Sequence, residues 1–252
     1  MANLFKKLKD TMYAVIDRKP YVSAVILAGG SGSRMGTDKT KQMLVLDGKP
    51  LVVHTLLAFE KSEYIDEIVV VAKEEELGEY ENFKNEYNIT KLSKTVCGGA
   101  IRQQSAKNGF DAINEKADYV AIHDAARALI TPEQIKEVVM SAYAHGAAIA
   151  ATPATDTIKY AEGVTVGETI PREKIWLVQT PQIFKDEIYR VAAYTAEKDG
   201  FIGTDDASLV ENVGITVYLV DTGADNFKVT YKSDLLRAEQ LLNERKGKEK
   251  CE

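Results

Sequence analysis

Short apolar runs rich in β-branched residues alternate along the chain with longer segments whose apolar residues recur at helical spacing. The runs predict strands at residues 22–27, 68–72, 95–96, 119–123, 147–152, 176–179 and 216–220. The segments between them predict helices near residues 50–61, 102–113, 185–197 and 233–242, and further helices that begin near Glu74, Thr131 and Asp205. Parallel strands need such helical crossovers, so the alternation predicts an α/β fold with a doubly wound, mainly parallel sheet.

Two β-prone runs, residues 157–161 and 164–169, interrupt this alternation. Glu162-Gly163 lies between them, and a short connection that contains glycine is typical of a β-hairpin. We therefore expect a protruding β-hairpin arm over about residues 153–173, within a main domain that covers residues 21–242.

The two ends of the chain fall outside this domain. Residues 1–20 place apolar side chains at helical spacing among lysines, which predicts an amphipathic extension. A helix that caps the domain is the favoured interpretation, and an arm for a membrane surface or a partner is the alternative. The segment has no unbroken apolar stretch and no cleavage site, which argues against a secretory signal. Residues 243–252 are expected to form a charged, frayed tail.

The first predicted strand runs directly into a glycine-dense loop, residues 28–36 (Ala-Gly-Gly-Ser-Gly-Ser-Arg-Met-Gly), and Lys41 follows it. Glycines let the backbone approach a ligand closely, and inward-facing N–H groups of such a loop bind phosphate. A Walker A loop is excluded by spacing, because Arg34 and Met35 stand where that motif needs Gly-Lys. A dinucleotide fingerprint that starts at Gly30 is excluded because it needs glycine or alanine in place of Met35. The sequence predicts a phosphate loop of a third kind.

Two later motifs also follow predicted strands. Residues 98–105 (Gly-Gly-Ala-Ile-Arg-Gln-Gln-Ser) resemble a nucleotide-binding segment of a known enzyme family, although Gly98-Gly99 alone is equally typical of a tight strand-to-helix turn. Residues 123–127 (His-Asp-Ala-Ala-Arg) place Asp124 at the carboxyl end of a strand, where ligands bind in doubly wound sheets. A carboxylate that faces a triphosphate there is a natural Mg²⁺ ligand, whereas His123 is better explained as a structural hydrogen-bonding residue.

Together these motifs resemble those of the 2-C-methyl-D-erythritol 4-phosphate cytidylyltransferases of the non-mevalonate isoprenoid pathway. The similarity runs from about Val22 to about Leu242 and includes weaker blocks at residues 156–157, 172, 180–182, 204–208 and 225–230. The chain departs from the family's usual pattern at Thr40 and Ala128, where proline is common. It also departs at Ala100, where an acidic residue is common.

The resemblance implies an enzyme that transfers CMP from CTP to 2-C-methyl-D-erythritol 4-phosphate with Mg²⁺ and releases pyrophosphate. It implies catalytic residues Arg34, Lys41, Arg172 and Lys228, and metal ligands Asp124 and Asp225. It implies nucleotide binding by Ala28, Gly29, Gly30, Gly32, Ser33, Gly99, Ala100 and Ser105, and substrate binding by Arg127, Thr157, Thr180 and Thr204. It also implies a homodimer in which arm exchange brings Thr157 and Arg172 to the site of the partner subunit.

Composition narrows the possible functions. The net charge of −6 argues against a nucleic-acid-binding protein, and no stretch reaches the roughly 18 continuous apolar residues of a membrane span. Cys97 and Cys251 predict neither a disulfide framework nor a thiolate metal site, which favours a reduced cytoplasmic protein.

The chain has 3 histidines and no catalytic-triad pattern, which fits a phosphate-monoester nucleophile. Such a phosphate is largely dianionic at neutral pH and needs no general base. The nearest alternative is a ribitol 5-phosphate or other polyol-phosphate cytidylyltransferase, and the blocks at residues 204–208 and 225–228 favour the isoprenoid enzyme over it. The alternative of another class is a non-catalytic nucleotide-binding module.

Overall fold

The computed structural model describes residues 18–30 and 40–249 of the 252-residue chain. The predicted amphipathic helix of residues 1–20 lies almost wholly outside this part, as do Gly32, Ser33 and Arg34 of the glycine-rich loop. Within the two described ranges, no helix combines the length and the apolar character needed to cross a membrane.

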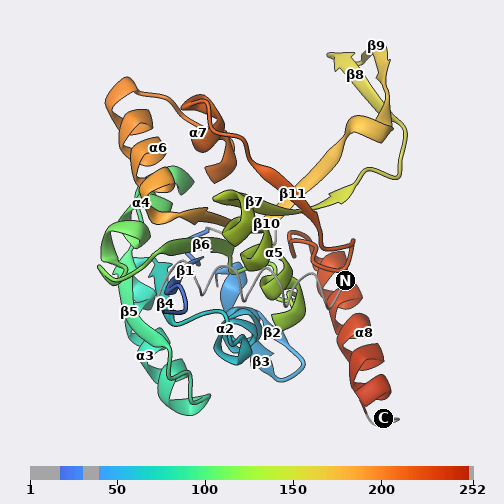
Figure 1. Cartoon of the computed structure of the whole chain (residues 1–252). Coiled ribbons are helices and arrows are strands. Elements are labelled where there is room, and N and C mark those ends of the chain that lie inside the picture. The colour runs from blue at the N-terminus through green and yellow to red at the C-terminus, as the bar shows by residue number, and fades with distance from the viewer. Residues whose placement is uncertain (1–17, 31–39, 250–252) are drawn as a thin grey trace.

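A seven-stranded sheet with the order β11-β7-β10-β6-β1-β4-β5 forms the centre of the fold (Figure 1). Its strands are β1 (Val22–Leu27), β4 (Glu67–Ala72), β5 (Leu92–Cys97), β6 (Tyr119–Asp124), β7 (Ala147–Pro153), β10 (Trp176–Lys185) and β11 (Tyr218–Asp221). Neighbouring strands are parallel except at β10, which is antiparallel to both β6 and β7. The predicted doubly wound, mainly parallel sheet is confirmed.

Helices cover both faces of the sheet. They are α2 (Leu51–Lys61), α3 (Leu77–Glu86), α4 (Arg102–Ala112), α5 (Pro132–His145), α6 (Asp186–Asp199) and α7 (Asp206–Asn212). Successive side chains of a strand point to opposite faces. Ala24 and Ile26 of β1 therefore pack in the core with α2, α3 and α5, and Val25 and Leu27 pack in the core with α4, α6 and α7. Burial on both faces explains why this strand is apolar apart from Ser23, whose buried hydroxyl donates a hydrogen bond to Glu67.

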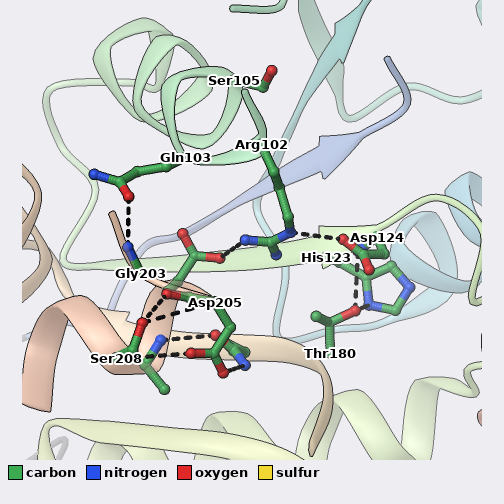
Figure 2. Close-up of polar contacts among 12 residues, drawn as sticks. Arg102, Gln103, Ser105, His123, Asp124, Thr180, Gly203, Asp205 and Ser208 are labelled. Carbon is green, nitrogen blue, oxygen red and sulfur yellow. Dashed lines mark hydrogen bonds and ion pairs between the residues drawn. The ribbon is translucent and has the colours of Figure 1, made fainter. Parts of the chain in front are cut away.

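Two of the predicted helix starts are fixed by capping residues. The Thr131 hydroxyl accepts a hydrogen bond from the N–H of Gln134, whose side chain accepts one from the N–H of Thr131, so a capping box begins α5. Asp205 caps α7 in the same way with Ser208 (Figure 2). Both helix starts confirm the sequence analysis.

Strand β10 requires a correction. The sequence analysis placed the end of this strand at Gln179, because the following Thr-Pro pair is typical of a turn, but the strand continues to Lys185. Pro181 has no N–H to donate to a neighbouring strand, and the register with β7 shifts between Val178 and Gln182. The bulge accommodates the proline, and antiparallel pairing resumes after it.

Two short antiparallel pairs lie outside the main sheet: β2 (Val45–Leu46) with β3 (Lys49–Pro50), and β8 (Ile158–Glu162) with β9 (Thr165–Ile170). The β8–β9 pair projects from the body of the molecule, which confirms the predicted arm (Figure 1). Tyr160, Val164 and Val166 on this arm are exposed. A two-stranded hairpin is at best marginally stable alone, so the arm needs further contacts to be held in place.

The C-terminal helix α8 (Lys232–Glu249) corrects the expectation of a frayed tail after Leu242. Nη1 of Arg245 donates a hydrogen bond to the backbone oxygen of Leu129 at 2.8 Å, and Lys246 forms an ion pair with Asp47. Lysine, arginine and glutamate are good helix formers, so the charged composition of this segment also favours a helix.

The carboxyl ends of β1, β5 and β6 meet at one edge of the sheet. The N–H groups of Ala28, Gly98 and Ala125 donate hydrogen bonds to backbone oxygens at the ends of neighbouring strands, at 2.7, 2.9 and 3.0 Å. These bonds bring the first glycines of the phosphate loop, the second glycine pair and Asp124 to the same place.

Candidate active site

A cleft of about 380 Å³ opens at this edge of the sheet. The described residues that line it are Leu27, Gly29, Gly30, Lys41, Gln42, Gly99, Ala100, Ile101, Arg102, Ser105, Asp124, Ala126 and Lys228. Among the described residues, the cleft thus combines three cationic side chains and one carboxylate between two glycine-rich segments. Such a site is suited to a polyanionic ligand, although the whole chain is acidic.

Asp124 pairs with two of the three cations. Its Oδ2 accepts a hydrogen bond from Nζ of Lys228 at 2.7 Å, and its Oδ1 accepts one from Nε of Arg102 at 3.3 Å (Figure 2 shows the second). Burial alone would raise the pKa of Asp124, but the charges of Arg102 and Lys228 outweigh burial and hold this pKa below its usual range. The carboxylate is therefore ionised at neutral pH.

Thr180, in the bulge of β10, lies behind Asp124. The N–H of Asp124 donates a hydrogen bond to the Thr180 hydroxyl at 3.0 Å, and this hydroxyl lies 3.1 Å from Nδ1 of His123 (Figure 2). Burial lowers the pKa of His123 to about 3, so its ring is neutral at neutral pH. These contacts fit a structural role for His123, as the sequence analysis predicted.

Arg127 holds the segment that carries Lys228. Nη1 of Arg127 donates a hydrogen bond to the backbone oxygen of Asn226 at 2.9 Å, and Nη2 donates one to that of Val178 at 3.2 Å. The side-chain amide of Asn226 donates in turn to the backbone oxygen of Thr180 at 2.9 Å. Arg127 and Asn226 together fix the 226–228 segment against β10. This arrangement is what places Lys228 at Asp124.

Only the two ends of the glycine-rich loop are described. Gly29 and Gly30 line the cleft on one side of the loop, and Lys41 lines it on the other, in the 3₁₀ turn Lys41–Met43. Lys41 is buried, with 7% of its surface exposed. The hydroxyl of Thr40, which replaces the proline common at this position, donates a hydrogen bond to Glu76 and so anchors the end of the loop.

The second glycine-rich segment is held by its own side chains. The N–H of Gly99 donates a hydrogen bond to the Ser105 hydroxyl at 3.0 Å, and the N–H of Ala100 donates one to Oε1 of Gln104 at 2.9 Å. A Cβ atom at Gly99 would lie 2.3 Å from Cβ of Gln104, so a larger residue does not fit without movement. A nucleotide that binds these N–H groups must replace Ser105 and Gln104 as their acceptors.

Comparisons with known proteins identify the family. The pattern of the 2-C-methyl-D-erythritol 4-phosphate cytidylyltransferases matches residues 22–244. The chain belongs to this family. Two relatives with this name, from Syntrophus aciditrophicus (strain SB) and Geotalea uraniireducens (strain Rf4), are 41% and 44% identical to it. The aligned regions cover 91% and 88% of this chain and 99% and 96% of the relatives.

A solved structure gives the same result. The crystal structure of 4-diphosphocytidyl-2C-methyl-D-erythritol synthase from Anaerococcus prevotii DSM 20548 is similar with a TM-score of 0.79 and 25% identity. The similarity covers 90% of this chain and all of that one. As a member of the cytidylyltransferase family, the protein is a nucleotidyltransferase, a class of enzyme that generally uses a divalent cation.

The cleft fits a cation that arrives with the nucleotide. Among the residues described, no group of three or more aspartates, glutamates, histidines or cysteines could hold a metal, and Asp124 is the carboxylate that lines the cleft. Mg²⁺ is commonly bound by one or two carboxylates together with substrate phosphates, and Asp124 fits this donor set. Asp225, the other predicted ligand, is exposed and does not line the described cleft.

The predicted site residues of the cytidylyltransferase that the structure describes do not all line the cleft. The structure gathers eight in the cleft, namely Gly29, Gly30, Lys41, Gly99, Ala100, Ser105, Asp124 and Lys228, and Ala28 is buried directly before them. Arg172 and Thr157 lie instead at the base of the arm, where both are exposed and Nη1 of Arg172 donates a hydrogen bond to the backbone oxygen of Thr155 at 2.7 Å. Thr204 is exposed just before α7.

Among the described residues, Arg102 is the charged residue of the cleft that the sequence analysis did not assign to the site. The available signal was its place as the arginine of the Gly-Gly-x-x-Arg-x-x-Ser segment, residues 98–105. Its second carboxylate partner, Asp206, was interpreted as part of a helix start and of the family block at residues 204–208, with no role at the site. An ion pair between residues so far apart in the chain leaves no local pattern, so only the fold could reveal it.

Proposed function

We propose that this protein transfers a cytidylyl group from CTP to 2-C-methyl-D-erythritol 4-phosphate and releases pyrophosphate. The observation that carries the proposal is the convergence of Lys41, Lys228 and Asp124 in one cleft between two glycine-rich segments. Membership of the family indicates the reaction. The cleft supplies the charged groups that this reaction requires.

The reaction is an in-line displacement at phosphorus. An oxygen of the substrate phosphate forms a bond to the α-phosphorus of CTP, and the bond between this phosphorus and the pyrophosphate oxygen breaks. Negative charge develops on the oxygens around the α-phosphorus, and Lys41 provides positive charge that stabilises it. The attacking phosphate is already largely dianionic, so the neutral, buried His123 is not needed as a base.

The remaining predicted residues complete this assignment. Arg34 acts with Lys41 at the α-phosphate, and Arg172 acts with Lys228 to position the substrate phosphate. The nucleotide is bound by residues of the two glycine-rich segments, namely Ala28, Gly29, Gly30, Gly32, Ser33, Gly99, Ala100 and Ser105. The polyol is bound by Arg127, Thr157, Thr180 and Thr204.

Mg²⁺ is the cation that we assign to the site, with Asp124 as its protein ligand. When bound, it neutralises part of the charge of the triphosphate. Lys228 and Arg102 keep the Asp124 carboxylate ionised and therefore ready for this role.

The active assembly that we propose is a homodimer with exchanged arms. Tyr160 and Val166 of the arm are exposed apolar residues, and so are Leu177 and Val178 in the first half of β10. Exposed apolar surface of this kind is typical of an interface between subunits. Exchange of the arms places Arg172 in the cleft of the partner subunit.

The decisive experiment is an assay of pyrophosphate release by the purified protein with CTP and either of two polyol phosphates. Preference for 2-C-methyl-D-erythritol 4-phosphate is the expected result. Preference for ribitol 5-phosphate would assign the protein to the nearest alternative. Binding of CTP without pyrophosphate release from any polyol phosphate would indicate a non-catalytic nucleotide-binding module.

A further inference from the structure

Arg102 is shared between two carboxylates. It begins α4, and its guanidinium points from there toward Asp124 at the wall of the cleft (Figure 2). Nη1 of Arg102 lies 2.7 Å from Oδ2 of Asp206, whereas Nε lies 3.3 Å from Oδ1 of Asp124. The shorter contact, to Asp206, is thus made outside the cleft. The longer contact is made with Asp124, the candidate cation ligand.

Asp206 is held in place by a further contact besides that with Arg102. Only 1% of its side chain is exposed, and its Oδ1 accepts a hydrogen bond from the hydroxyl of the fully buried Tyr189 at 2.8 Å. It is the first residue of α7, directly after the capping residue Asp205. A buried carboxylate is costly unless it is paired and hydrogen-bonded, and both partners are present here.

The two contacts of Arg102 oppose each other. A guanidinium can engage one carboxylate with two parallel hydrogen bonds, which is its strongest pairing geometry. The pull of Asp206 leaves Arg102 only one long hydrogen bond to Asp124. We propose that Asp206 is a positioning residue of the active site, which restrains Arg102 from closing on Asp124 and so leaves this carboxylate open to the cation that accompanies the nucleotide.

A purely structural role for Asp206 would be to dock the segment before α7 onto α4. Gln103, the next residue of α4, already makes such a link. Its Nε2 donates a hydrogen bond to the backbone oxygen of Phe201 at 3.0 Å, and its Oε1 accepts one from the N–H of Gly203 at 3.0 Å (Figure 2). Gln103 does not line the described cleft. It therefore offers a matched control that loosens the same contact without moving Arg102.

The test is a double-mutant cycle read out by binding. Asp206→Asn is made in the natural chain and in an Arg102→Gln background, and Gln103→Ala serves as the control. The affinity for Mn²⁺ in the presence of CTP is measured by the loss of the free-ion paramagnetic resonance signal, with thermal unfolding in parallel. Removing such an outer-shell partner typically weakens metal affinity by about 10- to 100-fold.

We expect Asp206→Asn to weaken Mn²⁺ binding by about this factor in the natural chain and to have no further effect once Arg102 is glutamine. Gln103→Ala is expected to lower the unfolding temperature without this loss of affinity. An unchanged affinity in Asp206→Asn, or an equal loss in both backgrounds, would overturn the proposal. If Asp206→Asn fails to fold, Tyr189→Phe removes one support of Asp206 and is expected to give a smaller loss of the same sign, and no loss in that variant would also overturn it.

This inference rests on the proposed function in one respect, because it assumes that a cation binds together with the nucleotide. The binding measurement needs no polyol phosphate, so it can fail while the natural protein still releases pyrophosphate. Conversely, an inactive natural protein that binds Mn²⁺ with CTP would contradict the proposed reaction and leave the role of Asp206 measurable.

Discussion

Nζ of Lys228 lies 2.7 Å from Oδ2 of Asp124, although the two residues stand 104 positions apart in the chain. Asp124 ends β6 in the middle of the sheet, and Lys228 follows β11 at its edge. A backbone hydrogen bond of 2.9 Å from the N–H of Val229 to the oxygen of Ala126 joins the two segments. The charged cleft therefore forms only when strands from both ends of the domain have assembled.

Replacement of Lys228 by methionine is expected to lower kcat/KM by about 100-fold, the loss typical of misplacing a reacting group, because Lys228 is assigned to positioning the substrate phosphate. The side chain is 38% exposed, so the fold should tolerate the change. Steady-state assays of pyrophosphate release, with circular dichroism to check the fold, measure the effect. Lys232→Met is the matched control, because Lys232 is exposed on α8 and does not line this cleft. Equal activity of the two variants would contradict the role of Lys228.

Lys41→Met should reduce kcat by orders of magnitude while KM for CTP changes much less. The reason is that Lys41 is assigned to charge that develops only in the transition state. Lys49→Met, on the β2–β3 hairpin outside the cleft, controls for the loss of a lysine nearby. A rise in KM with unchanged kcat would show that Lys41 binds the ground state instead.

The elements predicted with correct bounds are those whose local sequence decides them. Residues 22–27 are apolar except for Ser23 because both faces of β1 are buried, and the start of α5 is fixed by its own capping box. The second half of β10 was missed because Pro181 is typical of a turn in isolation. Only the neighbouring strands on both sides turn it into a bulge within a strand.

The candidate site likewise has features that the local sequence decides and features that depend on the fold. Glycine spacing pointed to a phosphate loop, and the position of Asp124 after a buried strand pointed to the cleft. The bridge from Asp124 through Arg102 to Asp206 could not be predicted, because it depends on how α4 and α7 lie on the same face of the sheet. The contacts of Arg127 with the backbone oxygens of Asn226 and Val178 join segments far apart in the chain, so they could not be predicted either.

Gly109→Ala is expected to destabilise the protein by about 1–3 kcal/mol, the usual cost of overpacking a core. A Cβ atom at this position of α4 would lie 2.3 Å from Cγ1 of Val25 and 2.6 Å from Cγ2 of Val71. Urea unfolding measures the change. Gly78→Ala in α3 is the control, since a Cβ atom there meets nothing within 4 Å, and it should leave stability equal or raised. Equal stability of the two variants would mean that α4 can shift without cost.

His54 should make the free energy of unfolding fall as the pH is lowered. Burial holds its pKa below the ordinary value, and its Nε2 lies 2.7 Å from the backbone oxygen of Leu46. As the pH drops, the unfolded chain takes up this proton before the folded one does, so stability is lost. Urea unfolding at about pH 7.5 and about pH 5.5 should show a smaller loss for His54→Gln than for the natural protein. Identical losses would exclude His54 as a contributor.

Arm exchange predicts that two inactive variants restore activity when mixed. In a hybrid dimer of Lys41→Met and Arg172→Ala chains, one cleft has its own Lys41 and receives an intact Arg172 from the other subunit. Equal mixing should therefore recover about a quarter of the natural activity, because half of the dimers are hybrids with one intact site of two. A mixture of Lys41→Met with Lys228→Met should recover none, because both lysines line the cleft of the same chain. Subunit exchange is verified with two affinity tags, and no recovery in the first mixture after verified exchange would place Arg172 outside a shared site.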